Sequence, residues 1–274
     1  MKKIFLAVLA VATAFAVSAQ YKAPHIVANG GYHKSPASGE KNTMSALKAA
    51  QKLKIYASEC DVNLTKDGEV LVVQSGWHPN RKASPKADVQ RSTMEKMLNV
   101  PFANGEYIST LEDYLKRAKK KPATKLMLDL KSQATPQRET ELVEAVLATV
   151  EQMGMQNNVE YLAAHPWACY ELAKKAPEGS KIAYLSGNYD PLYVKGLGCN
   201  SLDYNIKVWK KKKNWIKQAH KLGLTVNAWT VNKEEDIRWC IQNGVDIITT
   251  DEPVLAKKIV RRCAASRNNN AEIE

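Results

Sequence analysis

Residues 59–68 read Glu59-Cys60-Asp61-Val62-Asn63-Leu64-Thr65-Lys66-Asp67-Gly68. The apolar run over residues 56–65 is typical of a short strand, and Lys66-Asp67-Gly68 is typical of the tight turn that follows one. Side chains two positions apart on a strand point to the same face. We therefore expect Glu59 and Asp61 to lie together on one face of a sheet.

A second acidic strand has a similar form. Asp129 and Lys131 are separated by one residue within the apolar run of residues 125–132, so they also share a face. Three carboxylates and a lysine on one face repel one another and are poorly solvated unless something compensates. A divalent cation and a bound anion are the simplest compensation. The sequence thus predicts that Glu59, Asp61 and Asp129 bind a divalent metal, Ca²⁺ or Mg²⁺.

Strand-like and helix-like segments alternate along the 274 residues. The eight main strands are expected at residues 25–30, 56–65, 125–132, 159–165, 181–187, 201–206, 225–231 and 245–250. Repeated strand-then-helix units indicate a parallel sheet with helices outside it, and eight units match the size of an α/β fold of the (β/α)8 TIM barrel type. A doubly wound open sheet is the alternative, but Gly30-Gly31 is a weak match to the glycine-rich loop it needs.

The second strand region is followed by a less regular segment. Residues 69–75 are expected to form a further strand that pairs with the second one. Residues 76–109 lack clean periodicity, so we interpret them as a short insertion on the side where the loops after the strands lie. In barrels of this type that side holds the functional site.

The N-terminal segment has the features of a cleavable signal peptide. Lys2 and Lys3 precede an apolar run, and Val17-Ser18-Ala19 is a small-residue cleavage signal. Cleavage is expected near Ala19-Gln20, and no cysteine follows to mark a lipoprotein. We expect a secreted or periplasmic protein with a signal peptide at residues 1–19, one barrel at residues 20–267 and a polar tail at residues 268–274.

Charge and cysteine content limit the possible partners. The chain has 40 lysines and arginines against 28 aspartates and glutamates, a formal net charge of +12. Such a surface attracts anionic substrates, polyanions or membrane lipids, although a solvated helix face also explains it. The basic residues are not interleaved with aromatic residues in the pattern of a nucleic-acid-binding groove, so the sequence does not indicate binding to nucleic acid. The five cysteines lack a CxxC spacing, and most are expected to be buried free thiols, with Cys60 facing the layer between strand and helix.

The order of motifs resembles the glycerophosphodiester phosphodiesterase family over nearly the whole mature length. In the N-terminal part, Val27-Ala28-Asn29-Gly30-Gly31 falls at the family's His-Arg-Gly and Lys41-Asn42-Thr43 falls at its Glu-Asn-Thr. Residues 59–68 match its Glu-x-Asp-x-x-x-Thr-x-Asp-Gly, and Leu128-Asp129-Leu130-Lys131 matches its Leu-Glu-x-Lys. In the C-terminal part, Trp229-Thr230-Val231-Asn232 and residues 244–253 match its last two strands. The resemblance implies a (β/α)8 barrel and metal-dependent hydrolysis of a glycerophosphodiester or related phosphodiester in lipid headgroup metabolism. It also implies that Lys131 contacts the phosphate, and the alternative for Lys131 is a salt bridge with Asp129.

The departures from the family pattern concern proton transfer. The family uses two histidines as general acid and base, and Asn29 and Gln74 fall at their positions. Asparagine and glutamine form hydrogen bonds but do not exchange a proton near neutral pH. Acid–base catalysis typically contributes about 10²–10⁴-fold per group. The family's arginine is replaced by Gly30, and the glutamate before Asn-Thr is replaced by Lys41.

Three histidines are candidates for the missing proton-transfer roles. His165 ends a strand directly before Pro166, which predicts a place on the catalytic rim. His33 and His78 each lie four residues past a lost histidine. Trp229 is expected to stack on a substrate or to plug the barrel top.

Two functions remain open from the sequence. The first is a divergent, metal-dependent phosphodiesterase of the envelope, favoured by the retained acids. The second is a catalytically inactive family member that binds a phosphodiester, a lipid headgroup or a phosphorylated glycan, favoured by the missing histidines. Peripheral contact with a membrane surface fits either function, and the oligomeric state is left open.

Overall fold

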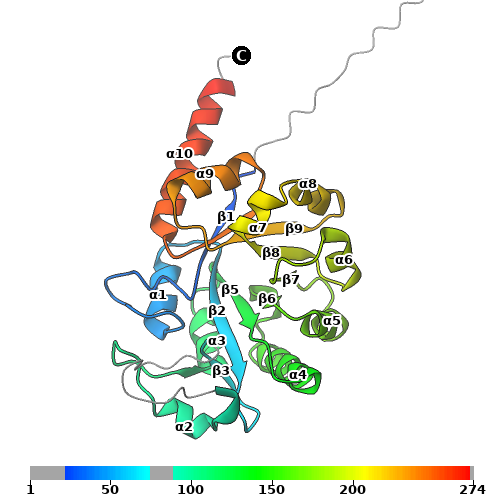
Figure 1. The fold of residues 1–274 in the computed structure, drawn as a ribbon. Coiled ribbons are helices and arrows are strands. Elements are labelled where there is room, and N and C mark those ends of the chain that lie inside the picture. Colours follow the sequence, from blue (N-terminus) through cyan, green and yellow to red (C-terminus); the bar gives the residue numbers. More distant parts are fainter. Residues whose placement is uncertain (1–21, 75–88, 272–274) are drawn as a thin grey trace, which may run out of the picture.

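Eight parallel strands close into a barrel in the computed structural model, which describes residues 22–74 and 89–271 (Figure 1). The strands are β1 (His25–Ala28), β2 (Ala57–Leu64), β5 (Lys125–Leu130), β6 (Val159–Ala163), β7 (Ile182–Tyr184), β8 (Ser201–Asn205), β9 (Thr225–Trp229) and β10 (Ile247–Thr250). Strand β1 pairs in parallel with both β10 and β2, which closes the ring. The predicted (β/α)8 barrel is confirmed, and the open-sheet alternative is wrong.

Helices follow the strands and surround the barrel (Figure 1). They are α1 (Met44–Lys52), α3 (Leu111–Lys119), α4 (Pro136–Gln152), α5 (Pro166–Lys175), α6 (Pro191–Gly196), α7 (Ile206–Lys211), α8 (Asn214–Lys221), α9 (Glu234–Gln242) and α10 (Pro253–Ala271). Thr43, Thr110 and Thr135 each accept a hydrogen bond from a backbone N–H of the first turn that they precede. These caps satisfy donors that would otherwise lack a partner, so the local sequence fixes where the helices start.

Two helix boundaries depend on the local backbone. The segment between β8 and β9 forms two helices and not one, because the backbone of Lys212 (φ −115°, ψ 45°) leaves the helical region after α7. Trp209 in α7 donates from Nε1 to the carbonyl of Asn227, which anchors α7 over the end of the barrel, whereas α8 packs beside α6 and β9. At the C-terminus, α10 continues through Ala271, so the helix includes the first residues of the expected tail.

The segment after β2 forms a small layer of its own beside the barrel. Strand β3 (Val70–Val72) pairs antiparallel with β2, as expected, and β4 (Ser109–Thr110) pairs antiparallel with β3. A short 3-10 helix, η1 (Val89–Arg91), and the helix α2 (Met94–Leu98) lie between them in the chain. Their buried apolar residues form a separate cluster, Leu71, Val73, Val89, Met97, Phe102 and Ile108. Residues 75–88 lie outside the described part.

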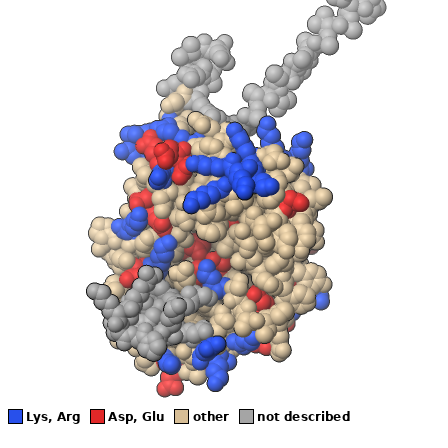
Figure 2. All heavy atoms as spheres, in the orientation of Figure 1, with Lys and Arg blue, Asp and Glu red and all other residues tan. Residues whose placement is uncertain are grey.

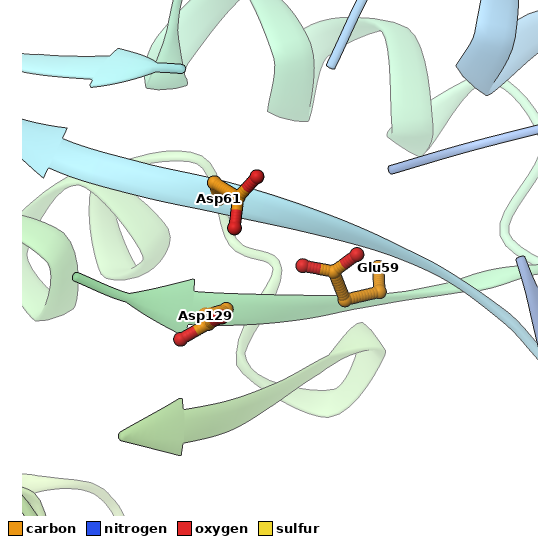
Figure 3. Close-up of side chains that lie close together, drawn as sticks. All are labelled: Glu59, Asp61 and Asp129. Atoms are coloured by element: carbon orange, nitrogen blue, oxygen red, sulfur yellow. The ribbon is translucent and has the colours of Figure 1, made fainter. Parts of the chain in front are cut away.

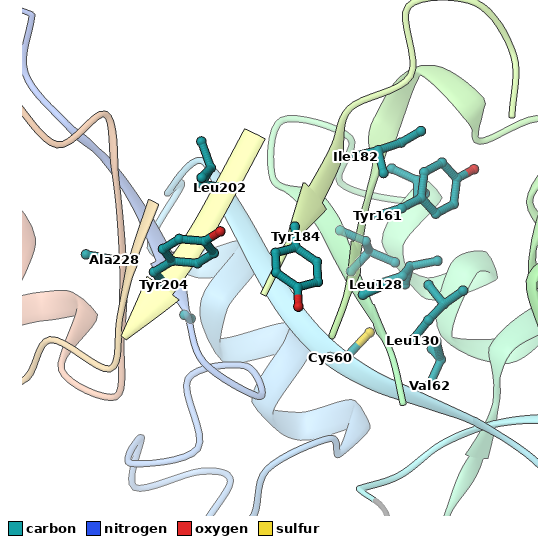
Figure 4. Packing of buried hydrophobic residues seen from close by; sticks show 14 of the residues in the cluster. Cys60, Val62, Leu128, Leu130, Tyr161, Ile182, Tyr184, Leu202, Tyr204 and Ala228 are labelled. Carbon is teal, nitrogen blue, oxygen red and sulfur yellow. The ribbon is translucent and has the colours of Figure 1, made fainter. Parts of the chain in front are cut away.

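Alternation along the strands separates two apolar layers. The outward side chains meet the helices in one large cluster, part of which Figure 4 shows. Cys60 is buried in that cluster, as predicted, and all five cysteines are free thiols. The inward side chains form a second cluster inside the barrel, made of Val27, Ala57, Met127, Leu162, Ala183 and Ile247. This cluster fills the barrel interior below the polar residues that follow it on the strands.

None of the helices within residues 22–74 and 89–271 combines the length and the apolar composition that crossing a bilayer requires. The predicted signal peptide lies outside the described residues.

Candidate functional site

Three carboxylates meet at the carboxyl ends of two neighbouring strands. Glu59 and Asp61 point inward from β2, and Asp129 points inward from β5, where it pairs in register with Asp61 (Figure 3). All three residues are buried, and one carboxylate oxygen from each lies within 4.8 Å of the others. The predicted common face is thus confirmed, and it faces the barrel interior.

Lys131 lies against this acidic cluster. Its Nζ is 2.6 Å from Asp129 Oδ2 and also forms an ion pair with Asp61. Burial alone would lower the pKa of Lys131, but the charges of Asp129, Asp61 and Glu59 outweigh burial and raise it. Lys131 therefore remains a cation at any ordinary pH, and the structure brings it together with the three acids as the sequence predicted.

One ammonium group does not balance three carboxylates. Burial raises the pKa of Glu59 well above its usual range, and the charges of Asp61 and Asp129 raise it further, against the opposing effect of Lys131. The pKa of Asp129 is also raised, chiefly by burial. The cluster thus has an excess of negative charge in a poorly solvated place, which a further cation would relieve.

The donor set fits a hard divalent cation. Asp129 Oδ1 is buried and has no hydrogen-bond partner within the described residues, so one carboxylate oxygen of the cluster is left for another ligand. Carboxylate oxygens are the ligands that Ca²⁺ and Mg²⁺ prefer. Glu59 Oε2 is held in place, since it accepts from the backbone N–H of Gly30 at 2.6 Å.

Asn42 holds Asp61 in position. Its Nδ2 donates to Asp61 Oδ2 at 2.7 Å, and its Oδ1 accepts from the backbone N–H of Asp61 at 3.0 Å. Asn42 has a positive φ of 61°, a conformation that asparagine tolerates better than most residues. This two-way contact explains why an asparagine precedes the cap of α1 at this point in the chain.

A cavity of about 320 Å³ opens above the acidic cluster. Figure 2 shows acidic and basic atoms in the hollow near the centre of the face that it draws. The cavity is lined by Asn29, Lys41, Glu59, Asp61, Gln74, Asp129, Lys131, Leu162, Leu185, Asp203, Trp229, Thr230 and Thr249. Every metal-binding and substrate-binding residue predicted from the sequence is among them.

Asn29 and Gln74, the two amides expected at the proton-transfer positions, both line the cavity. Asn29 Nδ2 donates to Asp251 Oδ1 at 2.9 Å, so its amide is held by the end of β10. Burial alone would raise the pKa of Asp251, but hydrogen bonds from Lys41, Asn232 and Asn29 lower it. Asp251 therefore remains an acceptor for these groups at neutral pH.

The histidines lie elsewhere. His165 is exposed at the start of α5 and is not one of the cavity residues, so the structure does not bring this predicted catalytic residue to the site. His33 contacts the carbonyl oxygen of Asn29 through Nδ1 at 3.2 Å, behind the lining, and burial, followed by the charge of Lys41, lowers its pKa. His78 lies outside the described residues. Within the described part of the chain, no imidazole lines the cavity.

The structure adds Asp203, which the sequence reasoning did not single out. Asp203 lies on β8, is almost fully buried and lines the cavity. Its Oδ1 has no hydrogen-bond partner within the described residues. Burial, with a smaller effect of Asp129, raises its pKa well above the usual range. Asp203 could have been predicted from the pattern that identified Glu59 and Asp61 on β2, since it is an acidic residue at an inward position near the end of a predicted strand.

Gly30 and Lys41 depart from the family pattern together, and the structure joins them. A side chain at Gly30 would begin 2.7 Å from Cβ of Lys41, so the stem of Lys41 occupies that space. Lys41 Nζ lies 2.9 Å from Asp251 Oδ1 at the wall of the cavity. A cation therefore remains at this wall although residue 30 offers none.

Trp229 lies on the wall of the cavity at the end of β9, two strands from β1 and across the barrel from β5. Its Nε1 donates to the carbonyl oxygen of Asp203 at 2.8 Å, and its ring is half-buried at the cavity. This contact fixes the ring of Trp229 beside Asp203.

Comparisons with known proteins agree with the fold and the site. The chain matches the model of the glycerophosphoryl diester phosphodiesterase family over residues 28–255. It is 25% identical over 236 residues to a glycerophosphodiester phosphodiesterase from Caldanaerobacter subterraneus subsp. tengcongensis, covering 81% of this chain and 93% of that protein. Among solved structures, a glycerophosphodiester phosphodiesterase from Parabacteroides distasonis superposes with a TM-score of 0.82 at 34% identity, covering 88% of this chain and 98% of the other.

A more distant structure shares the fold alone. It is a phosphodiesterase from Oleispira antarctica in complex with the product sn-glycerol-3-phosphate, with a TM-score of 0.75, 18% identity, and coverage of 87% of this chain and 97% of that one.

Proposed function

The chain belongs to the glycerophosphoryl diester phosphodiesterase family, and from this premise we propose that it hydrolyses a glycerophosphodiester or a related phosphodiester with the help of a divalent cation. The observation that carries the proposal is the buried cluster of Glu59, Asp61 and Asp129 with Lys131, at the cavity on the carboxyl end of the barrel. This end of a (β/α)8 barrel is where catalytic residues gather.

The cavity can hold a phosphate between two cations of this chain. Lys131 is fixed on the acidic side by Asp129 and Asp61, and Lys41 lies on the wall near β10. Both lysines line the same cavity, so a phosphoryl group within it can contact both. The sn-glycerol-3-phosphate bound by the Oleispira protein supports a small phosphate ester as ligand.

Glu59, Asp61 and Asp129 are the residues that would hold the divalent cation, Ca²⁺ or Mg²⁺. When bound, such a cation polarises a phosphoryl oxygen and offsets the charge that develops on it. Asn42 and the backbone of Gly30 keep the carboxylates of Asp61 and Glu59 oriented for this role.

Hydrolysis joins the oxygen of a water molecule to phosphorus and breaks the bond between phosphorus and the alcohol oxygen. The water loses a proton to the solvent, and the alcohol oxygen takes up a proton. We assign the donation of this proton to Asp203, since its raised pKa leaves a proton on the carboxyl group and its Oδ1 is free of partners within the described residues. Asn29 and Gln74 would orient the phosphodiester through hydrogen bonds without exchanging protons. Trp229, held by the Asp203 carbonyl, would pack against the alcohol portion.

A second function is favoured by the lining of the cavity. No imidazole of the described residues reaches it, and the Asn29 amide is occupied by Asp251. On this alternative, the protein binds a phosphodiester, a lipid headgroup or a phosphorylated glycan without turning it over. The leader-like residues 1–19 support a place in the cell envelope for either function.

The two functions are separated by measuring turnover and binding on the same samples. Glycerophosphocholine and glycerophosphoethanolamine are incubated with wild type, Lys131→Met and the control Lys174→Met, in Ca²⁺, in Mg²⁺ and in a chelator. We expect glycerol phosphate to be released by wild type and control only with a divalent cation, and at least about 100-fold more slowly by Lys131→Met.

Calorimetry with the same compounds provides the second measurement. Binding without product would favour the inactive alternative. Neither binding nor product with either compound would contradict both functions for this substrate class.

A further inference from the structure

One segment of the chain is strongly basic without any acidic residue. Residues 204–233 contain no aspartate and no glutamate, and their lysines are Lys207, Lys210, Lys211, Lys212, Lys213, Lys217, Lys221 and Lys233. The first seven belong to α7, α8 and the turn between them, and all seven are exposed. We call these seven residues the α7–α8 lysine surface.

Little of this charge is neutralised by the described residues. Lys210 forms an ion pair with Asp236, and Lys212 lies over the ring of Trp215, 5.2 Å from its centroid. In the part of the chain that the structure describes, the other members of the surface take part in no ion pair. A solvated helix usually intersperses both signs of charge, so an unbroken field of one sign is better suited to attracting an anionic partner.

The lysines of α7 and of the turn after it lie at the same end of the barrel as the cavity, whereas Lys217 and Lys221 lie farther along α8, toward the end where β9 begins. Helix α7 begins directly after β8, which carries Asp203, and Trp209 ties α7 to the backbone of β9 beside Trp229. Figure 2 shows lysine and arginine atoms gathered on the face that also displays the central hollow. A partner that covers the lysines of α7 and of the turn after it therefore lies next to the mouth of the cavity.

Apolar side chains stand beside the lysines. Leu192 and Tyr193 at the start of α6 are 68% and 45% exposed. A groove of about 470 Å³ lies between α6 and α8, lined by Leu192, Trp215 and Leu222 together with Gln218, Lys221 and Asp190, whose carboxylate caps the start of α6. A surface with cations around an exposed aliphatic side chain and a tryptophan matches the interface of a bilayer, where aromatic rings lie at the headgroup level.

We propose that the α7–α8 lysine surface docks on an anionic phospholipid bilayer, with Leu192 and Trp215 at the depth of the headgroups. Docking in this way places the cavity mouth beside the membrane surface, where lipid-derived ligands are released. The apolar groove favours a bilayer over a soluble polyanion, which would use the lysines but would leave Leu192 in water. This proposal does not depend on turnover in the cavity.

Binding to vesicles tests the proposal. The chain from Gln20 onward, which contains every described residue, is sedimented with vesicles of phosphatidylcholine and with vesicles that also contain phosphatidylglycerol. Three lysines are reversed in the variant Lys211→Glu/Lys213→Glu/Lys217→Glu. The matched control Lys120→Glu/Lys121→Glu/Lys174→Glu changes the net charge equally, at exposed positions near the C-terminal ends of α3 and α5, on the opposite end of the barrel.

We expect wild type to bind only the anionic vesicles, and less as salt is raised. Each lysine near an anionic surface contributes about fivefold to the partition constant, so the α7–α8 variant should bind on the order of 100-fold more weakly. The control should bind nearly as wild type does. Leu192→Ser should weaken binding further at a salt concentration that leaves some wild type bound.

Three results would overturn the proposal. Equal losses in the variant and the control would show a general charge effect and not a docking face. Absence of sedimentation with anionic vesicles would show that the surface is merely solvated. Binding to soluble polyphosphate without binding to vesicles would assign the surface to a polyanion instead.

Discussion

Asn29 Nδ2 donates a hydrogen bond to Asp251 Oδ1 across 2.9 Å, which joins the end of β1 to the end of β10 at the wall of the cavity. The same oxygen lies 2.9 Å from Lys41 Nζ. An imidazole in place of the Asn29 amide would have this carboxylate within reach, and an adjacent carboxylate orients a histidine and raises its basicity. The surroundings for proton transfer are therefore present although the histidine is not.

Restoring both proton carriers is expected to raise phosphodiesterase activity. Asn29→His with Gln74→His should increase the rate on glycerophosphocholine by about 10²-fold or more, because each general acid or base typically contributes about 10²–10⁴-fold. Each single variant should gain much less, since one group acts as acid and the other as base in the same displacement. A folded double variant that binds metal but shows no gain would indicate that the pocket serves another ligand.

Metal binding is expected to require the acidic cluster. Calorimetric titration with Ca²⁺ or Mg²⁺ should give a saturable signal for wild type. The affinity of Glu59→Gln for the cation should be at least about tenfold lower, because the variant keeps the size of the side chain but removes a charged ligand. The exposed Glu178→Gln should bind as wild type does. Equal titrations of wild type and Glu59→Gln, or no signal in either, would contradict the metal site.

Removing Lys131 is expected to make stability depend on metal. Lys131→Met leaves three buried carboxylates without their ammonium partner, and breaking a buried ion pair in this way costs about 3–5 kcal/mol. A divalent cation can replace part of that charge, so the deficit in the free energy of unfolding should be large in chelator and smaller in excess Ca²⁺. Urea denaturation of Lys131→Met and the control Lys174→Met measures both values. A deficit that does not change with Ca²⁺ would argue against a cation at this cluster.

Asp203→Asn is expected to flatten the dependence of stability on pH. The folded protein keeps a proton on Asp203 that the unfolded chain releases above the ordinary pKa of 3.8. The contribution of Asp203 to the free energy of unfolding is fully present below pH 3.8. It falls as the pH rises toward the pKa of Asp203 in the folded protein, by at most about 1.4 kcal/mol per pH unit. Asp203→Asn has no proton to lose, so its free energy of unfolding should fall less between about pH 4 and about pH 7. Parallel curves for the variant and wild type would show that Asp203 is not held neutral.

Much of the site follows from strand geometry that a single sequence contains. Period-two alternation places Glu59 with Asp61 and Asp129 with Lys131, and the register of β2 with β5 then brings both pairs together. The helix caps at Thr43, Thr110 and Thr135 are local in the same sense, because each depends on contacts within a few residues. The barrel itself was predicted from the count of strand-then-helix units, a property of order along the chain.

The sequence alone determined the inward acids and the closed barrel. Only the tertiary structure decided which distant residues share the cavity. Closure of β1 against β10 brings Asn29 and Lys41 to Asp251. The curvature of the closed sheet places Asp203 on the cavity wall, whereas His165 remains exposed at the start of α5. The physical reason is that local patterning fixes the face on which a side chain lies, whereas its neighbours across a barrel depend on strand register and loop path, which no local pattern encodes.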